Sequence, residues 1–173
     1  MRTRDVTLGA MLLAMALTIF VIESRIPVPI PIPGFKIGLS NIITLVTVYL
    51  WKKRYAFTVL MLRIIIGAAV CGSGMAVLYS AAGGMACFAV MEAMSKVAFG
   101  KLIPCVSMLG AIAHNSAQLI VAAFVLKSSA VFVYLPVLCA LGIAAGLFTG
   151  IAGSVCIKNK VISGLFKREV NDV

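Results

Sequence analysis

The sequence predicts an all-α integral membrane protein, a bundle of six transmembrane helices that forms one domain over residues 1–173. Hydrophobic residues make up 62% of the chain and charged residues 12%, whereas a soluble domain has about 25% charged residues. Long apolar segments alternate with short basic ones, as in proteins that cross a bilayer several times. The chain therefore has no room for a soluble catalytic domain beside its membrane helices.

Six segments are long and apolar enough to be membrane spans, since a spanning helix needs about 20 mostly apolar residues. They cover residues 6–23, 37–51, 55–72, 75–95, 104–126 and 131–156. The first follows two arginines, as a signal peptide would, but no small-residue cleavage site precedes Glu23, so we expect a retained helix. The second is short, because its fifteen residues rise only about 22 Å. We expect the loop before it to dip below the membrane surface.

Glycines punctuate the third, fourth and sixth spans. Those in the third and fourth are Gly67, Gly72, Gly74, Gly83 and Gly84. In the sixth span Gly142, Gly146 and Gly150 recur every four residues, which makes a ridge of small residues that lets helices approach closely. In the first span Ala10 and Ala14 have the same spacing, a less specific sign of a helix contact.

The distribution of Lys and Arg predicts the orientation, because these residues gather on the cytoplasmic side. With both termini in the cytoplasm, eleven of the 15 basic residues are inside, three are outside and Arg63 lies within a span. Aromatic Tyr49, Trp51 and Tyr55 flank the basic run 52–54, where an interfacial belt is expected. The membrane thus explains the net charge of +10 without nucleic acid, which needs a basic patch on a soluble face. We predict a multi-pass protein of the plasma membrane.

The loop between the first two spans, Ile22–Asn41, holds four of the six prolines, at positions 27, 29, 31 and 33. Proline fixes φ and disfavours helix in the residue before it, so this loop should be extended and stiff. It ends in Lys36 and Asn41, whose polar groups lie at the rim of the second span. The loop is either a rigid connector or the outer cap of a ligand site.

Polar side chains cluster in the run AHNSAQ of the fifth span. His114 and Gln118 are four residues apart and Asn115 and Gln118 three apart, so all three project from one sector of a helix. Such a face is unfavourable against lipid and should point into the bundle. The three groups either hold helices together by hydrogen bonds or orient a bound ligand.

Arg63 lies about midway along the third span, where a guanidinium needs a partner. The available acids are Glu23, near the outer end of the first span, and Glu92, toward the inner end of the fourth. Arg63 either forms a buried ion pair with one of them or, with Lys36 and His114, faces a carboxylate or phosphate ligand.

Several catalytic motifs are missing from the sequence. It contains no P-loop, no Ser-His-Asp set, and only two aspartates, Asp5 and Asp172. An aspartate-rich magnesium–diphosphate site is therefore impossible. We predict that the protein is not an enzyme and needs no cofactor or metal ion.

Three segments together resemble the Gx transporter family, whose members carry the description heptaprenyl diphosphate synthase component I. They are IESRIPVPIPIPGFKIGLSNIITL, the LRIIIG that contains Arg63, and GAIAHNSAQLIVA. The similarity covers nearly the whole chain. That family in turn resembles the substrate-binding S components of energy-coupling-factor (ECF) transporters, which are six-helix membrane proteins of about this size.

The resemblance implies a ligand in the outer half of the bundle, beneath the loop that joins the first two helices. It also implies that Ala10 and Ala14, which match an A-x-x-x-A motif, contact a coupling transmembrane subunit. Two partner ATPases would supply the energy, so the missing P-loop is expected. The synthase description hints at an isoprenoid or quinone-related substrate.

We therefore expect a transport component that captures a small organic molecule, expected to be anionic, from outside. The candidate substrate-binding residues are Lys36, Asn41, Arg63, His114, Asn115 and Gln118. The alternative is a non-catalytic membrane subunit of an isoprenoid (heptaprenyl diphosphate) synthesis complex. A purely structural membrane protein is the third possibility.

Overall fold

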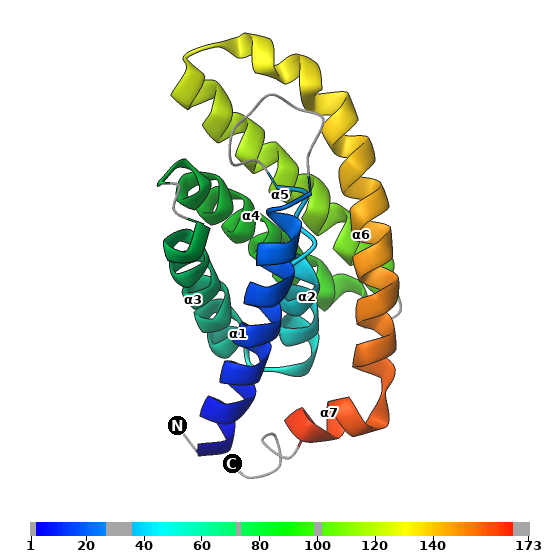
Figure 1. The fold of residues 1–173 in the computed structure, drawn as a ribbon. Coiled ribbons are helices and arrows are strands. Elements are labelled where there is room, and N and C mark those ends of the chain that lie inside the picture. The colour runs from blue at the N-terminus through cyan, green and yellow to red at the C-terminus, as the bar shows by residue number, and fades with distance from the viewer. Residues whose placement is uncertain (1–2, 27–35, 72–73, 99–101, 168–173) are drawn as a thin grey trace.

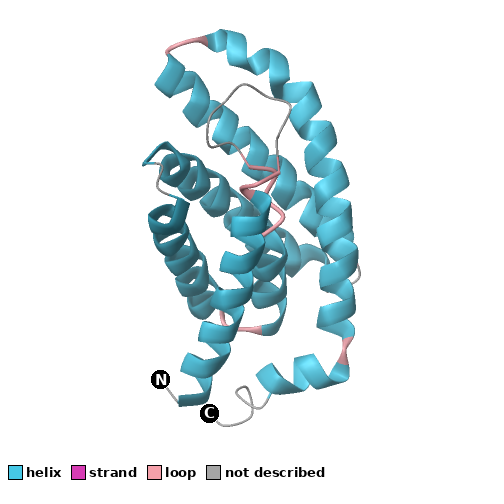
Figure 2. Ribbon diagram, in the orientation of Figure 1, coloured by secondary structure: helices cyan, strands magenta, loops and turns pink. Residues whose placement is uncertain are grey.

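The structure, a computed structural model, describes residues 3–26, 36–71, 74–98 and 102–167. These residues form helices and connecting loops, with no strand among them (Figure 1, Figure 2). The helices are α1 (Thr3–Glu23), α2 (Asn41–Leu50), α3 (Lys53–Cys71), α4 (Gly74–Ala98), α5 (Ile103–Leu126), the 3₁₀-helix η1 (Ser129–Tyr134), α6 (Leu135–Lys158) and α7 (Lys160–Lys167). The all-α prediction is confirmed for this part of the chain, and each predicted span contains a helix.

Among the described residues, four helical segments are long and apolar enough to cross a membrane: Thr3–Glu23, Val77–Ala98, Ile103–Leu126 and Ser129–Lys158. The chain is thus a membrane protein by helix length and composition. The prediction of a helix over 37–51 was too long, because α2 has only 10 residues. α3 has 19 residues, but three of them are basic, which lowers its hydropathy.

The residues before α2 lie inside the bundle. Lys36 is 6% exposed and Ser40 is 3% exposed, and residues 36–38 are non-helical. The end of the loop therefore turns into the bundle, and α2 begins only at Asn41. The four prolines at 27, 29, 31 and 33 lie outside the described residues.

α5 is the central helix of the bundle and packs along both α4 and α6. Figure 1 shows α6 running along one side of the bundle and α3 on the other, and α2 packs against α6. The glycine ridge of α6 faces α5: a Cβ added at Gly146 would lie 2.5 Å from Met108 Cα, and one at Gly150 would lie 2.6 Å from Pro104 Cα. The predicted close approach of helices is therefore confirmed. Across the same interface Ser107 and Thr149 share a hydrogen bond of 2.9 Å.

α7 turns away from α6 and lies across the end of the bundle that also carries the start of α1 (Figure 1). Its Phe166 is buried and meets the ring of Trp51 edge-on, with centroids 5.8 Å apart. No helix is predicted there from the sequence, because eight residues give too short a pattern to distinguish a helix from a tail.

Candidate functional site

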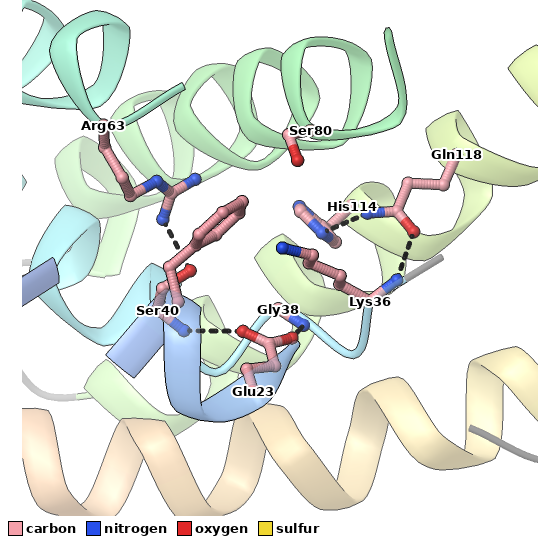
Figure 3. Close-up of a pocket in the computed structure, with 9 residues that line it drawn as sticks. Glu23, Lys36, Gly38, Ser40, Arg63, Ser80, His114 and Gln118 are labelled. Carbon is pink, nitrogen blue, oxygen red and sulfur yellow. Dashed lines mark hydrogen bonds between the residues drawn. The ribbon is translucent and has the colours of Figure 1, made fainter. Parts of the chain in front are cut away.

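A polar cavity lies inside the bundle, where α1, the loop before α2, α3, α4 and α5 meet (Figure 3). Its lining residues are Phe20, Glu23, Lys36, Gly38, Ser40, Arg63, Ser80, His114 and Gln118. The cavity volume is about 10 Å³, which is room for roughly one water molecule. Polar side chains gathered in an otherwise apolar membrane bundle are costly, so this cavity is the candidate functional site.

Glu23 fixes the loop before α2 to the end of α1. Its carboxylate, on a side chain only 3% exposed, accepts hydrogen bonds from the backbone N–H groups of Gly38 and of Ser40, the latter at 3.3 Å. Gly38 has φ +91°, a conformation that glycine adopts readily. A Cβ there would lie 2.7 Å from Asn41 Nδ2 and 3.0 Å from His114 Cδ2. The turn therefore needs glycine both for its backbone and for space.

Arg63 reaches from α3 toward the start of α2. Its guanidinium, 2% exposed, donates to Ser40 Oγ at 2.9 Å and to Asn41 Oδ1 at 3.2 Å. Gly84 gives it room, since a Cβ there would lie 3.3 Å from an Arg63 terminal nitrogen. Arg63 Nε and Asn41 Nδ2 are buried without a hydrogen-bond partner. Two donors are therefore left unsatisfied beside the cavity.

Lys36 lies on the other side of the cavity. Its Nζ is 3.1 Å from the centroid of the Phe20 ring, which attracts the cation through the ring's negative face. The Lys36 backbone N–H donates to Gln118 Oε1 at 3.2 Å. This bond ties the loop to α5.

His114 and Gln118 are one helical turn apart on α5, and His114 Nε2 lies 2.7 Å from Gln118 Nε2, so the two share a hydrogen bond. The imidazole lies against Gly83 of α4, where a Cβ would be 2.7 Å from His114 Cε1. The predicted polar face of the fifth span thus points into the bundle. Gln118 is the central residue of this face, because its amide forms hydrogen bonds with both the His114 ring and the backbone N–H of Lys36.

The charges around the cavity do not cancel. Arg63 and Lys36 carry positive charge, and Glu23 is the carboxylate among the lining residues. Glu92 is not a partner of Arg63, because it pairs with Lys96 at 3.4 Å. With His114 taken as neutral, the described lining residues therefore carry two positive charges and one negative charge.

The structure brings five of the six predicted site residues together. Lys36, Arg63, His114 and Gln118 line the cavity, and Asn41 contacts it through Arg63. The sixth, Asn115, is 1% exposed and donates to the carbonyl of Leu138 at 2.9 Å, so it joins α5 to α6 and does not line the cavity.

Five lining residues were not predicted as parts of the site: Phe20, Glu23, Gly38, Ser40 and Ser80. Glu23 was considered only as an ion-pair partner of Arg63. It is instead linked to Arg63 through Ser40, whose N–H bonds to Glu23 and whose Oγ bonds to Arg63. The glycine–serine turn next to Asn41 was the available signal, since a polar turn at the start of a buried helix needs an acceptor.

Ala10 and Ala14 lie on the exposed side of α1, far along the helix from the Glu23 end. Ala10 also lines a separate groove between α1 and α3, with a volume of about 200 Å³. Neither alanine contacts the polar cavity. Their exposure leaves them accessible to another membrane helix.

Comparison with known proteins gives one result. Residues 12–156 match the family model described as Heptaprenyl diphosphate synthase component I. No curated protein and no solved structure matches the chain.

Proposed function

The chain belongs to the heptaprenyl diphosphate synthase component I family, and from this premise we propose that it is a substrate-binding membrane component of an ECF-type uptake transporter. Its substrate is a small organic anion taken from outside the cell. The observation that carries this proposal is a pair of buried donors beside the cavity, Arg63 Nε and Asn41 Nδ2, that lack hydrogen-bond partners. An anion that entered would meet the positive charge of the Arg63 guanidinium and accept hydrogen bonds from these donors.

Unsatisfied donors support a ligand more directly than polarity alone. Buried polar groups are almost always hydrogen-bonded, so a buried group without a partner needs an explanation, such as a missing ligand. Arg63 Nε and Asn41 Nδ2 are two such exceptions at the same place. A carboxylate or phosphate beside them would accept from both, as forked guanidinium contacts with anions commonly do.

The cavity must enlarge before it can hold an organic molecule, since its volume is about 10 Å³. Lys36, Gly38 and Ser40 are the lining residues that lie outside a helix. Three hydrogen bonds hold their backbone N–H groups, from Gly38 and Ser40 to Glu23 and from Lys36 to Gln118. Because these residues lie outside a helix, they are the part of the lining easiest to displace. In this proposal the substrate replaces some of these internal hydrogen bonds with its own.

In this proposal the cavity lies toward the outside and both termini lie in the cytoplasm. The basic run 52–54 and the basic residues near the C-terminus support this orientation. In the same proposal, Ala10 and Ala14 on the exposed side of α1 contact a coupling transmembrane subunit. That subunit would carry two ATPases, which this chain needs because it has no P-loop of its own.

A second candidate is a non-catalytic membrane subunit of an isoprenoid synthesis complex. The family description favours it, because "component I" names one part of a larger assembly. The chain contributes little to such chemistry itself: Glu23 is the carboxylate among the described lining residues, and its oxygens already accept backbone hydrogen bonds. The two candidates therefore differ in partner rather than in the role of the cavity.

The test is mass spectrometry of small molecules that co-purify with the protein in detergent, for the wild type and for Arg63→Gln. We expect the wild type to retain an organic anion and the variant to lose it. A pull-down from native membranes should recover a coupling subunit and ATPases. Recovery of a prenyl synthase instead, with prenyl diphosphate synthesis lost on deletion although all precursors are supplied, would favour the second candidate.

A further inference from the structure

The end of the bundle that carries α7 combines three features that the proposed function does not use, apart from Ala10, which lines the first of them. They are an apolar groove, a ring of exposed cations and a half-packed amphipathic helix. The groove lies between α1 and α3 and is lined by Asp5, Val6, Gly9, Ala10, Leu13, Trp51, Tyr55, Thr58, Val59 and Leu62. Its volume of about 200 Å³ is twenty times that of the polar cavity, whose volume is about 10 Å³.

Exposed basic side chains surround the same end. They are Arg4, Lys52, Lys53, Arg54, Lys158 and Lys160. Arg4 donates to the carbonyl of Leu165 in α7, and Arg54 lies over the ring of Tyr55 at 5.7 Å. These contacts join Arg4 to α7 and place Arg54 beside Tyr55, which lines the groove.

α7 presents a broad apolar face, and only half of that face is packed. Ile162 and Phe166 contact the cluster around Trp51, whereas Val161 is 75% exposed and Leu165 is 44% exposed. At 100° per residue Val161 and Leu165 lie next to the packed pair, and Lys160 lies on the opposite side. A helix with this pattern rests in the interface plane of a membrane, with its apolar side in the acyl region.

We propose that this end of the protein binds an anionic phospholipid of the adjoining leaflet. One acyl chain occupies the groove between α1 and α3, and the phosphate headgroup lies among the basic residues 52–54 and Lys160. The groove and the cations together select this occupant. A soluble anion would leave the apolar groove empty, and a zwitterionic lipid would leave the cations uncompensated.

Trp51 gives a direct readout, because it is the single tryptophan of the chain and lines the groove. The full chain is reconstituted in phosphatidylcholine vesicles that contain a fixed fraction of either brominated phosphatidylglycerol or brominated phosphatidylcholine. Bromine quenches indole fluorescence on contact. We expect stronger quenching by phosphatidylglycerol than by phosphatidylcholine with the same acyl chains, by about threefold or more in relative affinity.

Two charge variants locate the headgroup. The double variant K52Q/R54Q should remove the preference for phosphatidylglycerol. The matched variant R25Q/K127N, which removes two exposed cations elsewhere in the chain, should keep it. Equal quenching by both lipids in the wild type, or equal loss in both double variants, would overturn the proposal.

Two further measurements distinguish the binding of a whole phospholipid from the binding of a phosphate group alone. Inorganic phosphate at the same ionic strength as a chloride control should not relieve the quenching; relief would assign the site to free phosphate. Gly9→Leu fills the groove from α1, where a Cβ would lie 3.4 Å from the Trp51 ring. It should weaken quenching by either brominated lipid while the melting temperature is kept, and unchanged quenching would show that no acyl chain enters the groove.

Discussion

The guanidinium of Arg63 donates a hydrogen bond to Ser40 Oγ across 2.9 Å, which joins α3 to the turn that starts α2. The backbone N–H of Ser40 in turn donates to Glu23 at 3.3 Å. Ser40 therefore separates the two opposite charges while linking them. This arrangement leaves the remaining guanidinium nitrogens free to donate to another acceptor. We therefore expect Arg63 to strengthen the binding of an anion and Glu23 to weaken it.

Arg63→Gln should reduce anion retention strongly. A hydrogen bond to a charged group contributes about 1.5–3 kcal/mol, so the affinity should fall by at least about tenfold. The measurement is the amount of organic anion per protein after detergent purification, by mass spectrometry. Arg25→Gln is the control, because Arg25 is exposed and does not line the cavity; equal retention by both variants would contradict a role for Arg63.

Glu23→Gln should act in the opposite direction on the same measurement. It removes the one negative charge of the described lining, so an anion should bind more tightly. It also weakens the hydrogen bonds to Gly38 and Ser40, which should lower the free energy of unfolding by about 1–3 kcal/mol. Glu92→Gln is the matched control, since its pair with Lys96 is partly exposed and contributes about 0–1 kcal/mol. A loss of retention in Glu23→Gln would show that Glu23 helps to hold the ligand.

Gly38→Ala should destabilise the protein by about 1–3 kcal/mol, because φ +91° is strained for any residue with a Cβ. The added methyl would also lie 2.7 Å from Asn41 Nδ2. Thermal unfolding in detergent checks this. Gly74→Ala is the control, since a Cβ there meets nothing within 4 Å, and its melting temperature should not fall.

The helices were largely predictable because hydrophobic runs bounded by basic turns have a length that only a membrane helix explains. The limits of α2 were not predictable, because residues distant in sequence bury the loop before it. Gln118 bonds to the Lys36 backbone 82 residues away, and no local pattern signals that. Whether α3 is a span does not follow from its length alone, because three of its 19 residues are basic.

The residue types gathered at the candidate site were predictable from the sequence. Which of these residues line the cavity and which join helices was not. Polar residues at helical spacing indicated an inward face, and His114 and Gln118 confirm it. Asn115 was assigned to the same sector, but a step of one residue turns a side chain by about 100°, which is enough to direct it to α6 instead. The role of Glu23 depends on a turn whose backbone N–H groups point at it, and side-chain patterns carry no information on that.

Asn115→Leu and Gln118→Leu should therefore differ in effect. Each removes a buried hydrogen bond and leaves a partner unsatisfied, at a cost of about 1–3 kcal/mol. Only Gln118→Leu should also lower anion retention, because it releases both His114 and Lys36. Loss of stability alone in both variants would favour a purely structural role for this face.

Gly146→Ala tests whether the α5–α6 contact holds the site together. The added methyl would lie 2.5 Å from Met108 Cα, and backbone cannot move aside as a side chain can, so α5 and α6 must separate. We expect a loss of about 1–3 kcal/mol, as for other overpacked positions, measured by thermal unfolding. Gly164→Ala is the control, since its Cβ would meet nothing within 4 Å. Because α5 also carries His114 and Gln118, anion retention should fall in Gly146→Ala but not in the control. An unchanged melting temperature in Gly146→Ala would contradict a close contact between Gly146 and Met108.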